Sequence, residues 1–289
     1  MTAGHPWRPL SGVRVLDLSR LLPGPYATLV LQDLGATVDK LEDTAGGDYL
    51  RFLPPLAEGE NPGFAALNRG KRSLSLDLKH PEGVRVFRRL VGAYDVLVEG
   101  FRPGVMERLG LSYETLSVDH PRLIYCAITG YGQDGPHRDR AGHDLSYLAR
   151  AGIVAMAGPA GDIPALPGMQ AADVAGGALP AAIGIVAALL DRARTGRGTY
   201  LDLSVAEGAL ALGMLGLMPA LAGVSAARGE DLLTGGLAVY GTYLAKDGVP
   251  VTMATLEPKF WMTFCAQVGL SPDPEALVPG SHQRALRAR

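Results

Sequence analysis

An alternation of short apolar runs and helical segments in the first half of the chain restricts the fold more than any other feature. Residues 13–18 (VRVLDL) have the length and β-branched content of a buried strand, and residues 26–34 have the apolar pattern of a helix. Gly35 follows at the usual position after a helix, and residues 37–41 (TVDKL) resemble a second strand. A strand, a helix and a strand in this order predict the start of a parallel sheet.

The same alternation continues toward residue 203. A long apolar helix is expected at residues 174–190, whereas residues 42–70 contain several Gly and Pro residues and are expected to be rich in loops. We therefore predict an α/β fold, with a Rossmann-like parallel sheet in a large domain formed by residues 1–200. Further strands are predicted at residues 73–78, 95–99, 123–128 and 200–203.

The last third of the chain has a different pattern. Residues 235–244 and 249–255 resemble two antiparallel strands, because the turn between them contains Asp247-Gly248, a strong hairpin signal. A helix is expected to begin at Glu257-Pro258. Residues 201–289 are therefore predicted to hold linker helices and a smaller α+β domain.

Composition excludes several classes of protein. With 47% hydrophobic residues, 19% charged residues and a net charge of −2, the chain is neither disordered nor suited to coating nucleic acid. Its first residues lack the basic flank and apolar run of a secretory signal, so a cytoplasmic location is predicted. Cys126 and Cys265 lie in apolar runs, which favours buried, reduced thiols over a disulfide or a metal site.

One uncharged segment, residues 208–227, is long enough to cross a bilayer. It contains four glycines and Pro219, and a helix that is apolar all round can equally be buried in a large core. We therefore predict no membrane span.

Several cations lie beside glycines at the ends or beginnings of predicted strands. Arginine suits bidentate contact with phosphate, although each of these residues taken alone could be an ordinary surface residue. No Walker sequence is present, and no Gly-x-Gly-x-x-Gly follows the first strand, so those two kinds of nucleotide site are not supported. The cations are Arg20, Arg69, Lys71, Arg72 and Arg102.

Three residues could move protons. His143 could be a base or a capping or core histidine, and Asp173 could be an acid or the N-cap of the following helix. Glu257 could simply complement the dipole of the helix that it precedes. The residues themselves leave these alternatives open.

The order of several motifs resembles the class III CoA-transferase family. The resemblance runs from about Leu10 to Leu270, and it implies a large CoA-binding domain, a small domain and an interlocked homodimer. Coenzyme A would arrive as part of an acyl-CoA substrate, so no separate cofactor is expected. The motifs are residues 16–20 (LDLSR), 68–73 (NRGKRS), 99–104 (EGFRPG), 130–132 (GYG) and 142–144 (GHD).

Within the family, Gly-His-Asp followed thirty residues later by Ala-Asp-x-Ala-Gly-Gly is similar to the α-methylacyl-CoA racemase branch. The resemblance implies an isomerase of fatty acid metabolism in which His143 and Asp173 are bases on opposite faces of the α-carbon and Glu257 pairs with Asp173. Gly176 and Gly177 would allow the thioester oxygen to approach backbone N–H groups. The residues implied to hold CoA are Arg20, Arg69, Lys71, Arg72, Arg102, Gly130 and Tyr131.

Two other functions fit the same motifs. In a CoA transferase, Asp173 would attack the thioester as a nucleophile and His143 would be incidental. A paralogue without catalysis would only bind acyl-CoA. The resemblance also implies that family members continue beyond residue 289, with a segment that returns to complete the large domain.

Overall fold

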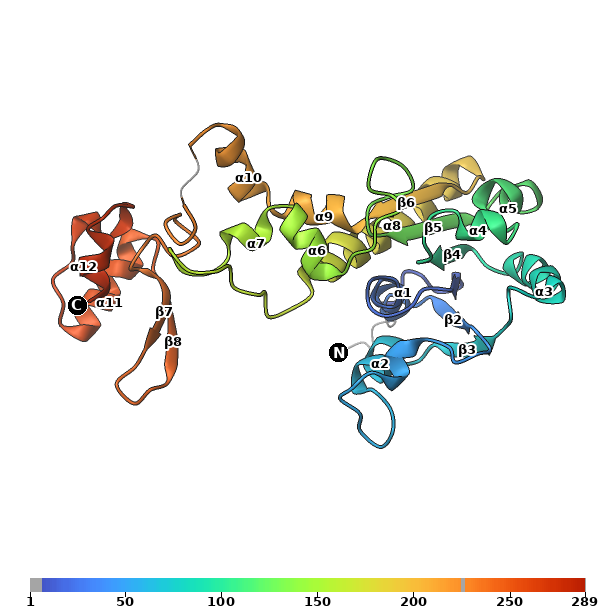
Figure 1. The fold of residues 1–289 in the computed structure, drawn as a ribbon, viewed down its shortest axis with the longest axis horizontal. Helices are drawn as coiled ribbons and strands as arrows, with labels where there is room; N and C mark the ends of the chain where they lie inside the picture. The colour runs from blue at the N-terminus through green and yellow to red at the C-terminus, as the bar shows by residue number, and fades with distance from the viewer. Residues whose placement is uncertain (1–6, 225–226, 289) are drawn as a thin grey trace, which may run out of the picture. The chain divides into compact units, whose positions relative to one another are not determined.

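The computed structural model describes residues 7–224 and 227–288, and the chain divides into two compact units. The first unit comprises Met1–Leu148 and Gln170–Leu212 and contains a parallel sheet. The second comprises Ala149–Met169 and Gly213–Arg289 and contains a two-stranded hairpin (Figure 1).

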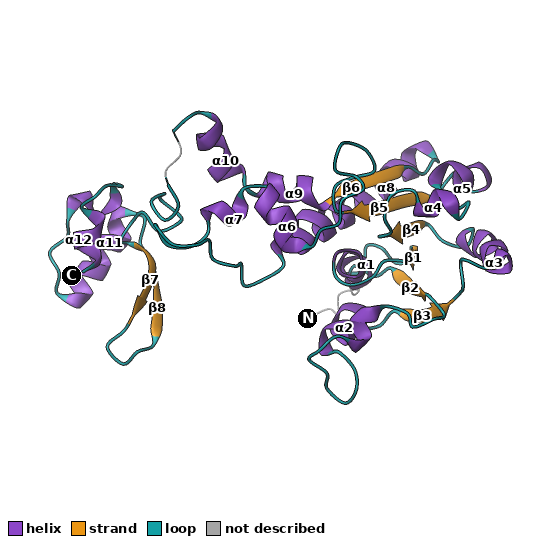
Figure 2. Ribbon diagram, viewed as in Figure 1, coloured by secondary structure: helices purple, strands orange, loops and turns teal. Residues whose placement is uncertain are grey.

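Six parallel strands form the sheet of the first unit in the order β3-β2-β1-β4-β5-β6 (Figure 2). The strand order reverses between β1 and β4, which is where open α/β sheets bind ligands. The predicted α/β fold is confirmed. The strands are β1 (Arg14–Asp17), β2 (Thr37–Glu42), β3 (Arg72–Ser75), β4 (Val96–Glu99), β5 (Ile124–Thr129) and β6 (Tyr200–Ser204).

Helices cover both faces of this sheet, with α1 and α8 on one side and α3, α4 and α5 on the other (Figure 1). Alternate residues of the central strands serve the two faces. Leu16 and Leu97, for example, pack in one cluster with Phe87 of α3 and Met106 of α4. These helices are α1 (Pro23–Asp33), α3 (Pro81–Val91), α4 (Val105–Arg108), α5 (Tyr113–Asp119) and α8 (Leu179–Thr195).

The interval at residues 42–70, predicted to be rich in loops, also contains two short helices. This interval holds a 3₁₀ helix, η1 (Tyr49–Phe52), and α2 (Pro62–Asn68). Asn61 caps α2 by accepting from the N–H groups of Gly63 and Phe64, and Pro62 occupies its first turn. Asn-Pro-Gly therefore begins a helix here, because a cap side chain and a proline suit a helix start as well as a turn.

Three helical segments of the first unit surround the candidate acid–base residues. They are α6 (Asp144–Arg150), the π-helical segment η2 (Ala172–Ala178), which runs directly into α8, and α9 (Val205–Leu212). Gly176 and Gly208 let η2 and α9 touch: a Cβ built on Gly208 would lie 1.8 Å from the Gly176 oxygen. Both positions therefore require glycine.

The second unit contains the predicted hairpin in shortened form. Its strands β7 (Tyr240–Leu244) and β8 (Pro250–Ala254) are antiparallel, but the predicted extension of the first strand back to residue 235 is absent. The remaining elements are α7 (Ile153–Met156), α10 (Met214–Leu221), α11 (Pro258–Val268), the 3₁₀ helix η3 (Pro274–Leu277) and α12 (Gln283–Arg287). Cys126 and Cys265 are both buried and free.

The segment at residues 208–227 is divided between α9 and α10, with residues 225 and 226 outside the described part. A different helix, Ala172–Thr195, is long and apolar enough to cross a membrane when only length and composition are considered. One such helix is weak support for a span, because core helices of soluble proteins pass the same test.

Candidate active site

Asp173 is the second residue of η2 and is partly buried. Its backbone N–H donates to Oδ1 of Asp144 over 2.9 Å. The residue before η2 is Ala171, and no side chain caps that end, so the interpretation of Asp173 as an N-cap is wrong. The Asp173 carboxyl is therefore not committed to a helix end.

Three neighbouring influences set the proton affinity of Asp173. Burial raises its pKa, the nearby Asp144 carboxylate raises it further, and the charge of His143 lowers it. The net result is a pKa of about 6, well above the ordinary 3.8. Asp173 can therefore exchange a proton near neutral pH.

His143 is exposed and lies directly before α6. Its backbone oxygen accepts from the N–H groups of Ser146 and Tyr147, so the first turn of α6 holds the His143 backbone in place. Because Asp144 binds the Asp173 backbone and His143 influences the Asp173 carboxyl, the two predicted bases lie in one neighbourhood.

Tyr147 connects this neighbourhood to the end of β5. Its hydroxyl donates to the Gly142 oxygen over 2.8 Å, and its ring meets that of Tyr131 edge-on at 5.2 Å. A Cβ on Gly130 would lie 2.5 Å from the Tyr147 hydroxyl oxygen, so only glycine fits there. Gly130 and Tyr131, predicted to contact CoA, thus lie beside the segment that carries His143.

Arg20 lies just after β1, at the strand-order reversal. Its guanidinium lies 5.5 Å from the ring centroid of Phe101, which follows β4, and 6.0 Å from that of Tyr49. Arg102 is exposed and lines a cavity of about 220 Å³ together with Glu99. The structure therefore places Arg20 and Arg102 at the ends of the two strands that flank the reversal.

Lys71 differs from the other predicted cations, because its side chain is only 1% exposed. Its ammonium donates to Asp17, Thr28, Asn68 and the Pro25 oxygen, at 2.8–3.1 Å. Three N–H groups already face four acceptors, so a direct phosphate contact would require these bonds to break. Lys71 joins β1, α1 and α2.

Arg69 and Arg72 remain exposed but have carboxylate partners. Arg69 binds Asp33 over 2.6 Å, and Arg72 binds Asp39 with two nitrogens over 2.5 and 2.7 Å. Both guanidinium groups are accessible to a ligand. Their prediction as CoA contacts stays a prediction.

Glu257 belongs to the second unit and is exposed. It occupies the N-cap position of α11, where its backbone oxygen accepts from the N–H groups of Phe260 and Trp261. Its side chain makes no capping hydrogen bond. Its predicted pairing with Asp173 stays a prediction.

Other atoms of the protein fill the space that a side chain at Gly176 or Gly177 would enter. Cβ atoms built there would meet the α9 backbone at 2.7 Å and the Val205 side chain at 3.0 Å, respectively. The close approach that these glycines allow at their Cβ positions is therefore internal, and the expectation that backbone N–H groups there bind the thioester oxygen stays a prediction.

The sequence reasoning missed Asp144 and the aromatic pair around Arg20. Asp144 was visible as the neighbour of His143 in Gly-His-Asp, but its bond to the Asp173 backbone depends on how α6 and η2 meet. Tyr49 gave no signal, and Phe101 was visible only as part of the motif at residues 99–104, because both rings approach Arg20 from distant parts of the chain.

Comparison with known proteins identifies the family of this chain. The sequence model of CoA-transferase family III matches residues 10–287. The chain belongs to CoA-transferase family III. As this membership predicts, a CaiB/BaiF family protein from Brucella suis has the same fold, with a TM-score of 0.84 and 34% identity over 97% of this chain and 75% of that one.

Relatives with two different activities are similarly close. Human α-methylacyl-CoA racemase is 42% identical over 91% of this chain, and mouse succinyl-CoA:glutarate CoA-transferase is 39% identical over 88%. The chain spans 66% of the length of the racemase and 58% of the length of the transferase. Racemases and transferases of this family both use CoA thioesters.

Proposed function

We propose that this protein racemises the α-carbon of 2-methylacyl-CoA thioesters by proton transfer between two bases. The observation that carries the proposal is the electrostatic coupling of two proton carriers, since the charge of His143 lowers the pKa of a carboxyl that burial and Asp144 raise. A reaction that needs only a carboxylate nucleophile has no use for a second proton carrier at this position.

In this mechanism neutral His143 takes the α-proton from one face of the substrate. The electron pair of the C–H bond moves into an enolate whose charge rests on the thioester oxygen, and protonated Asp173 supplies a proton to the opposite face. The product is the other enantiomer, with His143 charged and Asp173 ionised. The reverse reaction begins from that state.

Both starting states hold one proton shared between the two bases. Loss of that proton at high pH, or gain of a second at low pH, stops both directions together. With a carboxyl pKa of about 6, about a tenth of Asp173 is protonated at pH 7 if it titrates alone. We therefore expect one bell-shaped pH profile common to both enantiomers.

The proposed site uses the exposed arginines of the first unit to bind the substrate, and it takes Glu257 from the second unit. Arg20 and Arg102 at the strand-order reversal, with Arg69 and Arg72, would hold the phosphates of CoA. Glu257 would join the site as the partner of Asp173. A homodimer is part of the same proposal, and light scattering of the purified protein tests it.

CoA transfer between carboxylic acids is the second candidate, favoured by the 39% identity to succinyl-CoA:glutarate CoA-transferase. There the ionised Asp173 would attack the thioester carbonyl, the C–S bond would break, and CoA would leave as a thiolate. A pKa of about 6 leaves most of Asp173 ionised at neutral pH, which suits this role as well. A protein that binds acyl-CoA without catalysis is the third candidate.

Deuterium uptake at the α-carbon separates these candidates. Each pure enantiomer of 2-methylacyl-CoA is incubated with the protein in heavy water, then analysed for deuterium and configuration. Racemisation predicts uptake with inversion, and His143→Ala should still exchange the proton facing Asp173 but without inversion. His120→Ala is the matched control and should behave as wild type.

The other outcomes point elsewhere. Transfer of CoA to an added carboxylic acid, without deuterium uptake and with loss of activity only in Asp173→Asn, would support the transferase. Acyl-CoA bound but unchanged after long incubation would support a binding protein.

A further inference from the structure

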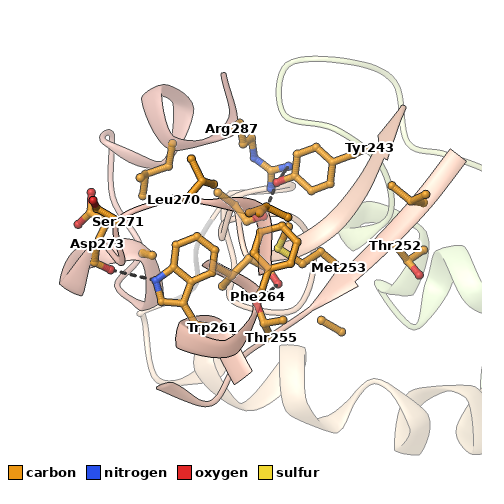
Figure 3. A pocket seen from close by; sticks show the side chains of 17 residues that line it. Tyr243, Thr252, Met253, Thr255, Trp261, Phe264, Leu270, Ser271, Asp273 and Arg287 are labelled. Atoms are coloured by element: carbon orange, nitrogen blue, oxygen red, sulfur yellow. Dashed lines mark hydrogen bonds between the residues drawn. The ribbon is translucent and has the colours of Figure 1, made fainter. Parts of the chain in front are cut away.

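A cavity of about 710 Å³ lies inside the second unit and has no part in the proposed reaction. It is bounded by both hairpin strands, α11, the turn before η3, and α12 (Figure 3). This volume is within the range of sites for small organic molecules. All of its lining residues belong to the second unit.

Most of the wall is apolar. Val251 and Met253 contribute from β8, while Trp261 and Phe264 contribute from α11, with their rings stacked 5.8 Å apart. Val268 extends the wall along α11. An apolar body would replace water at this wall with favourable van der Waals contact.

One cation, Arg287, interrupts this wall, and Figure 3 shows its guanidinium beside the Tyr243 ring. Its terminal nitrogens donate to the Gly235 and Leu237 oxygens and to the Tyr243 hydroxyl. In the described part of the chain, no carboxylate oxygen lies within 4.0 Å of this guanidinium. A guanidinium has five N–H donors, so two of them remain for an anionic ligand.

The polar groups of the lining differ between the two sides of the cavity. Ser271 and Asp273 lie there, away from Arg287 (Figure 3), and the Trp261 Nε1–H donates to the Asp273 backbone oxygen. A carboxylate would be attracted to the Arg287 side, whereas an ammonium group would be repelled from it. The lining therefore distinguishes a carboxylate from an amine of the same shape.

We propose that this cavity binds an amphipathic monocarboxylate, with the carboxylate on Arg287 and the apolar body against Met253, Trp261 and Phe264. None of its lining residues is among the proposed acid–base residues. The proposal does not depend on whether the enzyme is a racemase or a transferase.

Binding of decanoate to the full chain tests the proposal, with decanol and decyltrimethylammonium as ligands of matched length. Trp261 provides the signal because it lines the cavity, and Trp261→Phe shows whether Trp7 contributes. Decanoate should change the Trp261 fluorescence saturably and bind about tenfold more tightly than decanol, as expected for one charge-assisted contact. The ammonium ligand should bind more weakly than decanol.

Two substitutions in α12 sharpen the test. Arg287→Met should remove the preference for decanoate over decanol, whereas Arg284→Met, on the exposed surface of the same helix, should leave it unchanged. Circular dichroism shows whether each variant is folded. If Arg287→Met unfolds, the comparison of acid, alcohol and ammonium in the wild type still decides the matter.

Three results would overturn the proposal. One is the absence of saturable binding, and another is equal affinity for decanoate and decanol, which would mean an apolar surface without recognition of charge. The third is a cavity covered by a second copy, seen as a dimer in light scattering whose Trp261 signal does not respond to decanoate until the dimer is diluted apart.

Discussion

Asp17 and Glu99 end two neighbouring parallel strands, β1 and β4, at the same edge of the sheet. Both side chains are almost fully buried, Asp17 at 0% and Glu99 at 4% exposure. Their pKa values nevertheless move in opposite directions, to about 2 for Asp17 and about 8 for Glu99. Burial alone therefore does not decide the charge of a carboxyl group at this edge.

The difference comes from the charges and hydrogen-bond donors that lie near each carboxyl group. Burial raises the pKa of Asp17, but the ammonium groups of Lys71 and Lys40 outweigh it, with hydrogen bonds from Ser19 and Thr28. Burial also raises the pKa of Glu99, which receives one backbone hydrogen bond, from Phe101, and lies near other acidic groups. Asp17 is held as an anion and Glu99 as a neutral acid at pH 7.

The largest effect is expected from removing the Lys71 ammonium group, which pairs with Asp17. Lys71→Met leaves Asp17 buried without its main partner, and loss of one member of a buried pair costs about 3–5 kcal/mol of unfolding free energy. Urea unfolding at neutral pH measures this loss. Lys79→Met, in an exposed pair 3.8 Å from Asp43, is the control and should be nearly neutral. A loss below about 1 kcal/mol in Lys71→Met would contradict the assigned role.

Glu99→Gln should remove the pH dependence of stability that Glu99 contributes. The unfolded chain releases the Glu99 proton near pH 4.5 and the folded chain near pH 8, so Glu99 makes the protein less stable as pH rises between these values. The unfolding free energy of the protein should fall by about 3 kcal/mol over the upper part of this pH range, as the pH approaches 8. Glutamine does not ionise, so Glu99→Gln should remove this fall.

Asp17 should give the opposite dependence, which provides an internal check on the Glu99 result. Its stabilisation is complete above its ordinary pKa of 3.8 and is lost as pH falls toward about 2. Unfolding curves at several pH values separate the two windows. A Glu99→Gln protein that keeps the wild-type slope between pH 5 and 8 would show that Glu99 is ionised in the folded state.

Asp173 lies between these extremes, with partial burial and a pKa of about 6. Asp144→Asn preserves an oxygen to accept from the Asp173 N–H but removes the charge that raises the Asp173 pKa. The acidic limb of the racemisation profile should therefore move to lower pH, with at most a modest change in stability. Rates measured for both enantiomers across pH test this, and an unmoved limb would show that another group controls it.

The smallest effect is expected at the exposed pair of Arg69 and Asp33. Both side chains are 54% exposed, so Arg69→Met should cost about 0–1 kcal/mol despite the 2.6 Å contact. If Arg69 also holds a CoA phosphate, the same variant should weaken acyl-CoA binding, as measured by calorimetry. A loss of stability as large as that of Lys71→Met would mean that burial is not what separates the two pairs.

Local sequence patterns predicted most of the strands, because each strand has its own apolar run and each helix has residues typical of a helix start or end. Residues 37–41 became β2 with one residue added, and Asp247-Gly248 correctly indicated the hairpin of β7 and β8. Local patterns failed where one signal has two meanings. Asn61-Pro62-Gly63 has a composition typical of loops but begins α2.

The candidate site was only partly predictable for a different reason. His143 and Asp173 were found by their motifs, but the π-helical turn that holds Asp173 and the bond from Asp144 depend on how η2 meets α6 and α9. Likewise, Lys71 belonged to a run of cations in which its neighbours Arg69 and Arg72 are exposed. Adjacent residues of one charge thus received different environments.

The sequence by itself determined the alternation of strands and helices, the family, and the identities of the acid–base candidates, because these depend on residue order and on motifs. Only the tertiary structure decided which charged groups are buried, which partners they meet, and hence which carboxyls hold a proton at neutral pH. Those properties depend on distances between residues far apart in the chain, such as Asp17 and Lys71 at 3.1 Å.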